Sequence, residues 1–371
     1  MNVLNSAPKP NDVPLEPGPT DSVTRIEFNP VVDYLAVGSW DNQVRVYEVN
    51  ATTGQITPKA AVQHEGPALN LSWSKDGTKL LTCSADKTAK ILDVATGSSQ
   101  ATQIAAHDGP ISCVKWLDMP SGQGQGVCVT AGWDKMVKYW DMRQPNPIAT
   151  ITATERIYAL DAVDKLMVFG TADRNVSIVD LNNPGVVKSS KESPLKMQTR
   201  TITCFPAKSP AGNGYAIGSV EGRVAIQYAE DKDSGQNFSF RCHRGEPVTV
   251  NQMNRTTETA VYSVNDISFN RLHGTFSTAG SDGSLSFWDK DLRTRLKTFV
   301  PKDLNNAGDT VNKIPPTPIV ATAFSKESNL FAYAFSYDWS RGYTGAVQQN
   351  LNKVMIHQVQ QEEIKPKQKG K

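Results

Sequence analysis

Residues Ala131–Asp141 read AGWDKMVKYWD: a doublet of small residues, then Trp-Asp, then a short β-like run that ends in Trp-Asp. The same arrangement recurs along the chain, with an acidic residue at the same place in each copy. The acidic positions are Asp41, Asp86, Asp134, Asp173, Glu221, Asp282 and Asp338. We call these seven residues the acidic anchors. Their mean spacing of about 50 residues indicates a repeated supersecondary unit with insertions.

Seven copies at this spacing predict an all-β fold, a seven-bladed WD-repeat β-propeller. The sequence between anchors is consistent with strands: Leu69–Trp73 and Lys79–Cys83 are short β-rich runs, and Ser74–Gly77 between them has turn chemistry. No apolar periodicity of helical length is evident. A ring of blades leaves few free sheet edges, which keeps a large all-β chain from aggregating.

The repeat changes the expected domain organisation. A chain of 371 residues would ordinarily suggest two or three domains. We instead expect a single propeller over residues 21–360, after an N-terminal extension (1–20) and before a basic C-terminal tail (361–371). Asn11–Leu15 is a candidate ring-closing strand, although its prolines restrict such a strand to a sheet edge.

Histidine and aspartate recur in the repeat for a structural reason. In a WD-type blade, a histidine, a strand Thr or Ser, the anchor aspartate and a strand tryptophan can form one buried hydrogen-bond network. In the third copy these residues are His107, Thr130, Asp134 and Trp140. The second copy has Leu92 at the tryptophan position, so its network is incomplete. We interpret these residues as structural and not catalytic.

Composition and motifs favour a binding protein over an enzyme. The formal net charge is only +2, and the five cysteines are widely spaced, without a Cys-x-x-Cys pair. There is no His-Glu-x-x-His or Gly-x-Ser-x-Gly motif, and no apolar run long enough for a membrane helix. We expect an intracellular, soluble, non-enzymatic protein with no cofactor, no metal, no small-molecule substrate and no membrane insertion.

Function is expected where the chain departs from the repeat. The longest intervals between anchors are Glu221 to Asp282 and Asp282 to Asp338, and they contain the aromatic and basic segments Phe238–Arg244 and Lys290–Lys297. The C-terminus carries a further basic cluster, made of Lys365, Lys367, Lys369 and Lys371. Such a tail is usually a solvated end, yet its lysines could also contact RNA phosphates.

Arg223 follows the glycine after its acidic anchor, in the segment Glu221–Ile226. Its guanidinium could hold a partner's carboxylate through two hydrogen bonds, or it could pair within its own blade. Chemistry alone favours the second interpretation.

Several segments resemble a known family, the WD-repeat branch that contains the nuclear-pore mRNA-export protein and its mitotic-checkpoint relative. The resemblance runs from about Asn11 to Pro366. The shared segments are Glu221–Ile226, Phe240–Arg244, Ser263–Phe269, His273–Phe276 and Gly280–Gly283. Other segments are similar to the mRNA-export member: Asp86–Lys90, Ser193–Lys196, Phe287–Asp291 and Ser336–Gly342.

The resemblance implies a propeller that binds the GLEBS segment of an FG-repeat nucleoporin and helps messenger ribonucleoprotein cross the pore. The implied location is the nucleus, at the nuclear pore complex of the nuclear envelope, with shuttling to the cytoplasm, and a mitotic spindle role occurs in some relatives. The implied contact residues are Arg223 for an acidic residue of the segment, Phe240, Trp288 and Arg293 for a groove, and Lys290 and Arg295 for its cationic rim. Burial of Trp288 in its own blade is the competing interpretation. Alternatives are an adaptor for GLEBS-like motifs of checkpoint kinases and a direct RNA-binding protein.

Overall fold

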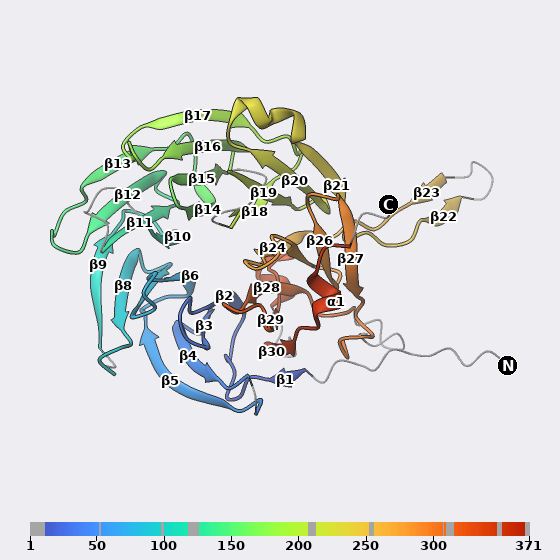
Figure 1. Cartoon of the computed structure of the whole chain (residues 1–371), viewed down its shortest axis with the longest axis horizontal. Helices are drawn as coiled ribbons and strands as arrows, with labels where there is room; N and C mark the ends of the chain where they lie inside the picture. Colours follow the sequence, from blue (N-terminus) through green and yellow to red (C-terminus); the bar gives the residue numbers. More distant parts are fainter. Residues whose placement is uncertain are drawn as a thin grey trace.

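The computed structural model describes residues 12–51, 53–97, 100–117, 126–206, 213–251, 256–306, 308, 315–346 and 351–367. Their strands form seven four-stranded antiparallel sheets arranged as a ring around a central axis (Figure 1). The prediction of an all-β, seven-bladed WD-repeat β-propeller is therefore confirmed.

Blades one to four each use four strands that are consecutive in the chain. Blade one consists of β2 (Val23–Phe28), β3 (Tyr34–Ser39), β4 (Gln43–Val49) and β5 (Ile56–Gln63). Blade two consists of β6 (Ala68–Trp73), β7 (Lys79–Ser84), β8 (Thr88–Asp93) and β9 (Ala101–Ala106). Blade three consists of β10 (Ile111–Trp116), β11 (Val127–Gly132), β12 (Met136–Asp141) and β13 (Ala149–Thr152). Blade four consists of β14 (Ile157–Val163), β15 (Leu166–Thr171), β16 (Asn175–Asp180) and β17 (Val187–Glu192).

The later blades carry the insertions. Blade five consists of β18 (Thr199–Cys204), β19 (Gly214–Ser219), β20 (Arg223–Tyr228) and β21 (Phe238–Arg241), with the 3-10 helix η1 (Asp231–Gln236) before its last strand. A separate ribbon of β22 (Val248–Asn251) and β23 (Thr256–Glu258) then stands out from the ring (Figure 1). Blade six consists of β24 (Val264–Phe269), β25 (Phe276–Gly280), β26 (Leu285–Asp289) and β27 (Thr294–Phe299). Blade seven contains β28 (Ile319–Phe324), β29 (Leu330–Phe335) and β30 (Lys353–Gln358), with the 3-10 helix η2 (Gly342–Gly345) before β30.

The N-terminus closes the ring by completing blade seven. Strand β1 (Val13–Pro14) pairs with β30 as the fourth strand of that sheet (Figure 1). The next residue, Leu15, is 1% exposed, and its amide donates to the Val354 carbonyl at 2.9 Å. The structure therefore places a ring-closing strand within the candidate segment, whose first residue, Asn11, lies outside the described residues.

The acidic anchors have equivalent places in the ring. Each follows the second strand of its blade, for example Asp134 between β11 and β12, and Asp282 between β25 and β26. In an antiparallel meander, the turn between the second and third strands lies at one end of the blade, and the turn between the first and second strands lies at the other end. All seven anchors therefore lie on one face of the ring.

The hydrophobic core is divided among the junctions between neighbouring blades. One cluster joins blades three and four through Val129, Tyr139 and Phe169, each at most 1% exposed. Comparable clusters join the other neighbours, including blades seven and one. The five cysteines lie buried in this core as free thiols.

The C-terminal segment differs from the expected tail at its start. Residues Gln361–Ile364 form the short helix α1, which contacts β26 and β27 of blade six (Figure 1). Ile364 is 0% exposed, and its carbonyl accepts a hydrogen bond from the Thr275 hydroxyl at 2.8 Å. The segment that packs against the propeller therefore extends at least to Ile364, because the apolar side chain at that position is buried. In the described part of the chain, no helix is long and apolar enough to cross a membrane.

Candidate partner-binding site

Three aromatic side chains lie together where the outer strand of blade five meets blade six. Phe240 of β21 lies 4.5 Å from Trp288 of β26 and 6.2 Å from Phe238, measured between ring centroids. All three are only partly buried. We call the surface formed by Phe238, Phe240 and Trp288 the aromatic groove.

Trp288 serves its own blade and the aromatic groove together. Its indole N–H donates to the Thr278 hydroxyl at 3.0 Å, which is the hydrogen bond expected of the repeat's tryptophan. The same ring packs against Phe240 of the neighbouring blade. The two interpretations of Trp288 are therefore compatible, because the polar edge of the ring points into the blade while part of the ring remains exposed.

Two arginines cover the aromatic groove from blade six. The guanidinium of Arg293 lies 4.6 Å from the centroid of the Phe238 ring, and that of Arg295 lies 5.9 Å from Trp288. Strand pairing sets Arg295 directly opposite Trp288. Both arginines are exposed. Each keeps its charge available to an incoming group while its guanidinium interacts with an aromatic face.

Lys290 does not belong to the cationic rim, which corrects the expectation from the sequence. The residue is 2% exposed, its ammonium lies 2.6 Å from the Asp291 carboxylate, and it lies 5.1 Å from the centroid of the Phe205 ring. Strand β26 ends at Asp289, so Lys290 starts a turn. Its side chain is therefore directed into the junction between blades five and six and not to the surface.

Arg223 has a carboxylate partner within its own blade. Its Nε atom lies 3.6 Å from the Glu221 carboxylate, and its side chain is 29% exposed. The other Glu221 oxygen, Oε1, is buried and has no hydrogen-bond partner among the described residues. Gly222 between them has φ +63°, and a Cβ there would lie 2.6 Å from the Cys242 carbonyl oxygen. The glycine therefore fixes this tight turn, but the Arg223–Glu221 pair itself is long.

The predicted structural residues of blade three form one hydrogen-bond network. His107 contacts the Asp134 carboxylate at 2.8 Å and the Thr130 hydroxyl at 2.7 Å. The indole N–H of Trp140 donates to the same hydroxyl at 2.8 Å. Burial lowers the pKa of His107 against the opposing effect of Asp134, which favours a neutral ring in a structural role.

Blade six contains a second complete network that the sequence reading did not identify. His243 contacts the Asp282 carboxylate at 2.9 Å and the Thr278 hydroxyl at 2.9 Å, and Trp288 completes the set. The β22–β23 ribbon is inserted between His243 and its anchor. The insertion makes the sequence separation between His243 and Asp282 longer than that between His107 and Asp134 in blade three. The histidine therefore could not be assigned to its anchor by spacing.

A further surface surrounds the end of the central channel on the face of the acidic anchors. The residues that precede anchors in blades one, three, five and seven line one cavity there: Trp40, Trp133, Val220 and Tyr337. Trp40 stacks on Trp339 with the ring centroids 4.0 Å apart, and Trp133 is 42% exposed. We call the set of Trp40, Trp133, Val220, Tyr337 and Trp339 the aromatic collar. The recurring position before the anchor was the available sequence signal.

The C-terminal lysines are only partly described. Lys365 and Lys367 are exposed, whereas Lys369 and Lys371 lie outside the described residues. Neither described lysine is part of the aromatic groove. Among the described residues, no group of three or more His, Cys, Asp or Glu side chains could hold a metal ion.

Comparisons with known proteins agree with the fold and extend over nearly the whole chain. Residues 26–119 match the family described as "Anaphase-promoting complex subunit 4 WD40 domain", and residues 252–289 match "WD domain, G-beta repeat". The "Poly(A)+ RNA export protein" of Schizosaccharomyces pombe is 46% identical over 358 residues, covering 96% of this chain and 93% of the relative. The "mRNA export factor" of Mus musculus is 40% identical over 363 residues, covering 96% and 92%. The chain belongs to the family of WD-repeat mRNA export factors.

Proposed function

We propose that this protein is a non-enzymatic scaffold that supports mRNA export by binding the GLEBS segment of an FG-repeat nucleoporin. The relatives' names point to the export of RNA. The observation that carries the proposal is the aromatic groove with its arginines. Partly exposed aromatic rings next to exposed guanidinium groups are typical of surfaces that bind protein partners.

The geometry suggests how an acidic, partly apolar segment would bind. The apolar side chains of the segment pack against Phe240 and Trp288, where burial of the exposed ring surface supplies the free energy. Arg293 lies above Phe238 and Arg295 above Trp288, and both guanidinium groups attract acidic residues. At Arg223, an incoming carboxylate with two-point geometry replaces the long contact to Glu221.

The binding test compares wild type with Arg223→Glu, using isothermal titration calorimetry with a GLEBS peptide. We expect affinity to fall about tenfold or more, because the variant places a negative charge next to the segment's acidic residue. Arg271→Glu is the matched control, since Arg271 is exposed in the turn between β24 and β25, at the other end of a blade. Equal affinity of the Arg223 variant and wild type, at equal thermal stability, removes Arg223 from the contact.

The cellular part of the proposal concerns location and cargo. We expect the protein in the nucleus, at the nuclear pore complex of the nuclear envelope, with shuttling to the cytoplasm. Its expected cargo is messenger ribonucleoprotein. A fluorescent fusion is expected at the nuclear rim and to leave it when the GLEBS partner is removed. A mitotic spindle role is assessed by following the same fusion through division.

The first alternative is a mitotic-checkpoint adaptor that binds GLEBS-like motifs of checkpoint kinases. A competition between a nucleoporin GLEBS peptide and a kinase-type peptide separates the two. Our proposal expects the nucleoporin peptide to displace the other at lower concentration.

The second alternative is direct RNA binding, and the aromatic groove gives it a specific basis. Single-stranded RNA binds proteins through bases stacked on aromatic rings and phosphates held by basic residues. Phe238, Phe240 and Trp288 supply rings, and Arg293 and Arg295 supply charge. Loss of RNA affinity in Arg295→Glu, without loss of GLEBS affinity, would favour this alternative.

A further inference from the structure

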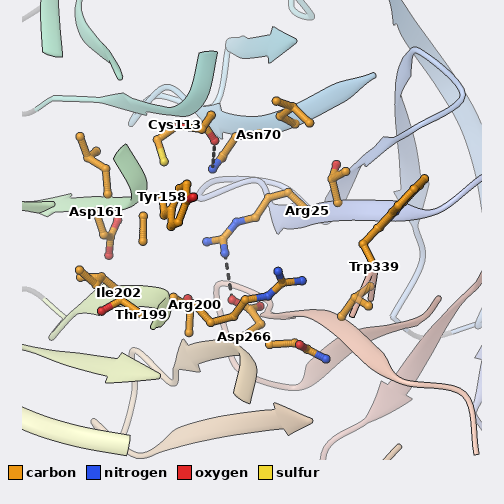
Figure 2. Close-up of a pocket in the computed structure, with 18 of the residues that line it drawn as sticks. Arg25, Asn70, Cys113, Tyr158, Asp161, Thr199, Arg200, Ile202, Asp266 and Trp339 are labelled. Carbon is orange, nitrogen blue, oxygen red and sulfur yellow. Dashed lines mark hydrogen bonds and ion pairs between the residues drawn. The ribbon is translucent and has the colours of Figure 1, made fainter. Parts of the chain in front are cut away.

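A cavity of about 510 Å³ lies along the axis of the propeller, inside the aromatic collar. Its wall is built from the innermost strands of the blades, and several charged side chains project into it (Figure 2). The volume is within the range of small-ligand sites in proteins, about 300–1,000 Å³. Its electrostatics therefore decide which ligand it could hold.

Two of the cations in the cavity wall are already neutralised. Arg25 pairs with Asp266 at 3.0 Å, and Lys115 pairs with Asp161 at 2.9 Å. The second oxygen of Asp266 accepts hydrogen bonds from the Thr322 amide and hydroxyl at 2.7 and 3.1 Å. The charge of each cation is therefore balanced by a carboxylate, although Arg25 still has a buried Nε donor without a partner among the described residues.

Arg200 of β18 is different. Within the described part of the chain, its guanidinium donates one hydrogen bond, to the Asp338 carbonyl at 3.1 Å. Among the described residues, no carboxylate oxygen lies within 4.0 Å of it. The Asp338 carboxylate is occupied by the Ser281 hydroxyl at 2.5 Å and the Ser340 amide at 3.1 Å. Since a guanidinium has five N–H donors, Arg200 has donors to spare, and its side chain is exposed to the channel.

The remaining charges limit the ligand to a single negative group. Three cations line the cavity, but so do four carboxylates, those of Glu27, Asp161, Asp266 and Asp338. This surplus of one acid disfavours a polyanion such as RNA most strongly, because the repulsion grows with the charge of the ligand. A carboxylate carries one charge, and its planar shape matches two N–H groups of a guanidinium.

We propose that the central channel is a carboxylate-binding site in which Arg200 is the receptor. The aromatic collar at the mouth, with Trp40, Trp133 and Trp339, favours a carboxylate attached to an apolar or aromatic group. The carboxylate comes either from a free organic acid or from an acidic side chain of a peptide. The site is independent of the GLEBS contact proposed at Arg223.

The first experiment uses phenylacetate as the probe and phenylacetamide as its neutral counterpart. Binding to the full-length protein is followed by calorimetry and by tryptophan fluorescence, since three tryptophans line the cavity. We expect phenylacetate to bind at least about tenfold more tightly than the amide, because the paired charge is lost in the amide. Measurable binding of both probes with equal affinity overturns the proposal, whereas the absence of binding by either leaves the decision to the peptide probes described below.

Variants then assign the contact to Arg200. Arg200→Gln is expected to weaken phenylacetate binding about tenfold or more, whereas Arg200→Lys, which keeps the charge but loses the planar fork, has a smaller effect. Arg271→Gln is the control for the loss of an arginine outside the channel, and circular dichroism verifies each fold. The proposal is overturned if Arg200→Gln binds phenylacetate as tightly as wild type does. If Arg200→Gln misfolds, phenylacetate binding by Arg200→Lys that is as tight as that of wild type overturns the proposal.

The second experiment separates the two sources of the carboxylate. The probes are capped peptides, Gly-Glu-Phe-Gly and its Gly-Gln-Phe-Gly counterpart, with inorganic phosphate as competitor. Binding of the Glu peptide but not of phenylacetate identifies an acidic side chain of a docked peptide as the source, and binding of both admits a free acid. Binding of neither carboxylate, or displacement by phosphate at lower concentration than by phenylacetate, contradicts the proposal.

Discussion

His357 of β30 joins the two ends of the chain, and this contact makes ring closure dependent on pH. One ring nitrogen lies 2.7 Å from the Asp12 carboxylate and the other lies 3.0 Å from that of Glu363. The His357 side chain is only 8% exposed. Burial alone would lower its pKa, but the hydrogen bonds and charges of Asp12 and Glu363 outweigh burial and raise the pKa to about 9.

The sign of the effect follows from the direction of this pKa change. The pKa of His357 is higher in the folded protein than the unfolded value of about 6.5, so the protonated ring stabilises the fold. The stabilisation is complete below about pH 6.5 and is lost as the pH rises through about 9. The difference between the two pKa values corresponds to about 3 kcal/mol in the free energy of unfolding.

The perturbation is His357→Gln, and the assay is urea unfolding followed by tryptophan fluorescence at about pH 6 and about pH 10. Wild type is expected to be more stable than the variant at the lower pH, and this difference should shrink by about 3 kcal/mol at the higher pH. Asp12→Asn should remove part of the same pH dependence, since it removes one of the two carboxylates. A difference between wild type and His357→Gln that does not change with pH would refute the reasoning.

Three further predictions concern the network, the aromatic groove and the tail. Asp134→Ala leaves a buried nitrogen of His107 unpaired, so urea unfolding should show a loss of about 1–3 kcal/mol. Trp288→Phe loses the hydrogen bond to Thr278 but keeps an aromatic ring in the groove. The free energy of GLEBS binding, measured by calorimetry, should therefore change less than the free energy of unfolding, measured in urea. Ending the chain at Pro366 removes three lysines but keeps α1, so the salt dependence of RNA binding should fall by about 2 if they contact phosphates. An unchanged salt slope would identify the tail as a solvated end.

The repeat predicted the ring because each copy carries its own turn and strand chemistry. The hairpin expected at Leu69–Trp73 and Lys79–Cys83 appears as β6 and β7, whose bounds differ from it by one residue each. The network of blade six was missed for a physical reason. A buried hydrogen bond depends on where two residues meet in the folded blade, and an inserted ribbon changes their separation in sequence without changing that meeting point. His243 and Asp282 therefore kept the contact but lost the recognisable spacing.

The position of Lys290 shows why side-chain direction at a surface could not be read from the repeat. The family resemblance implied that Lys290 belongs to the cationic rim, and regular strand alternation would likewise set it on the same side as Trp288. The alternation stops where β26 ends at Asp289, and the Lys290 ammonium instead lies against Phe205.

The aromatic collar could not be predicted from the repeat for a different reason, because no single blade contains it. Closure of the ring brings turns from four blades around one channel, so Trp40 and Trp339 stack although they lie near opposite ends of the chain. Local chemistry thus determined the blades, whereas the candidate binding surfaces depend on strand ends and on closure.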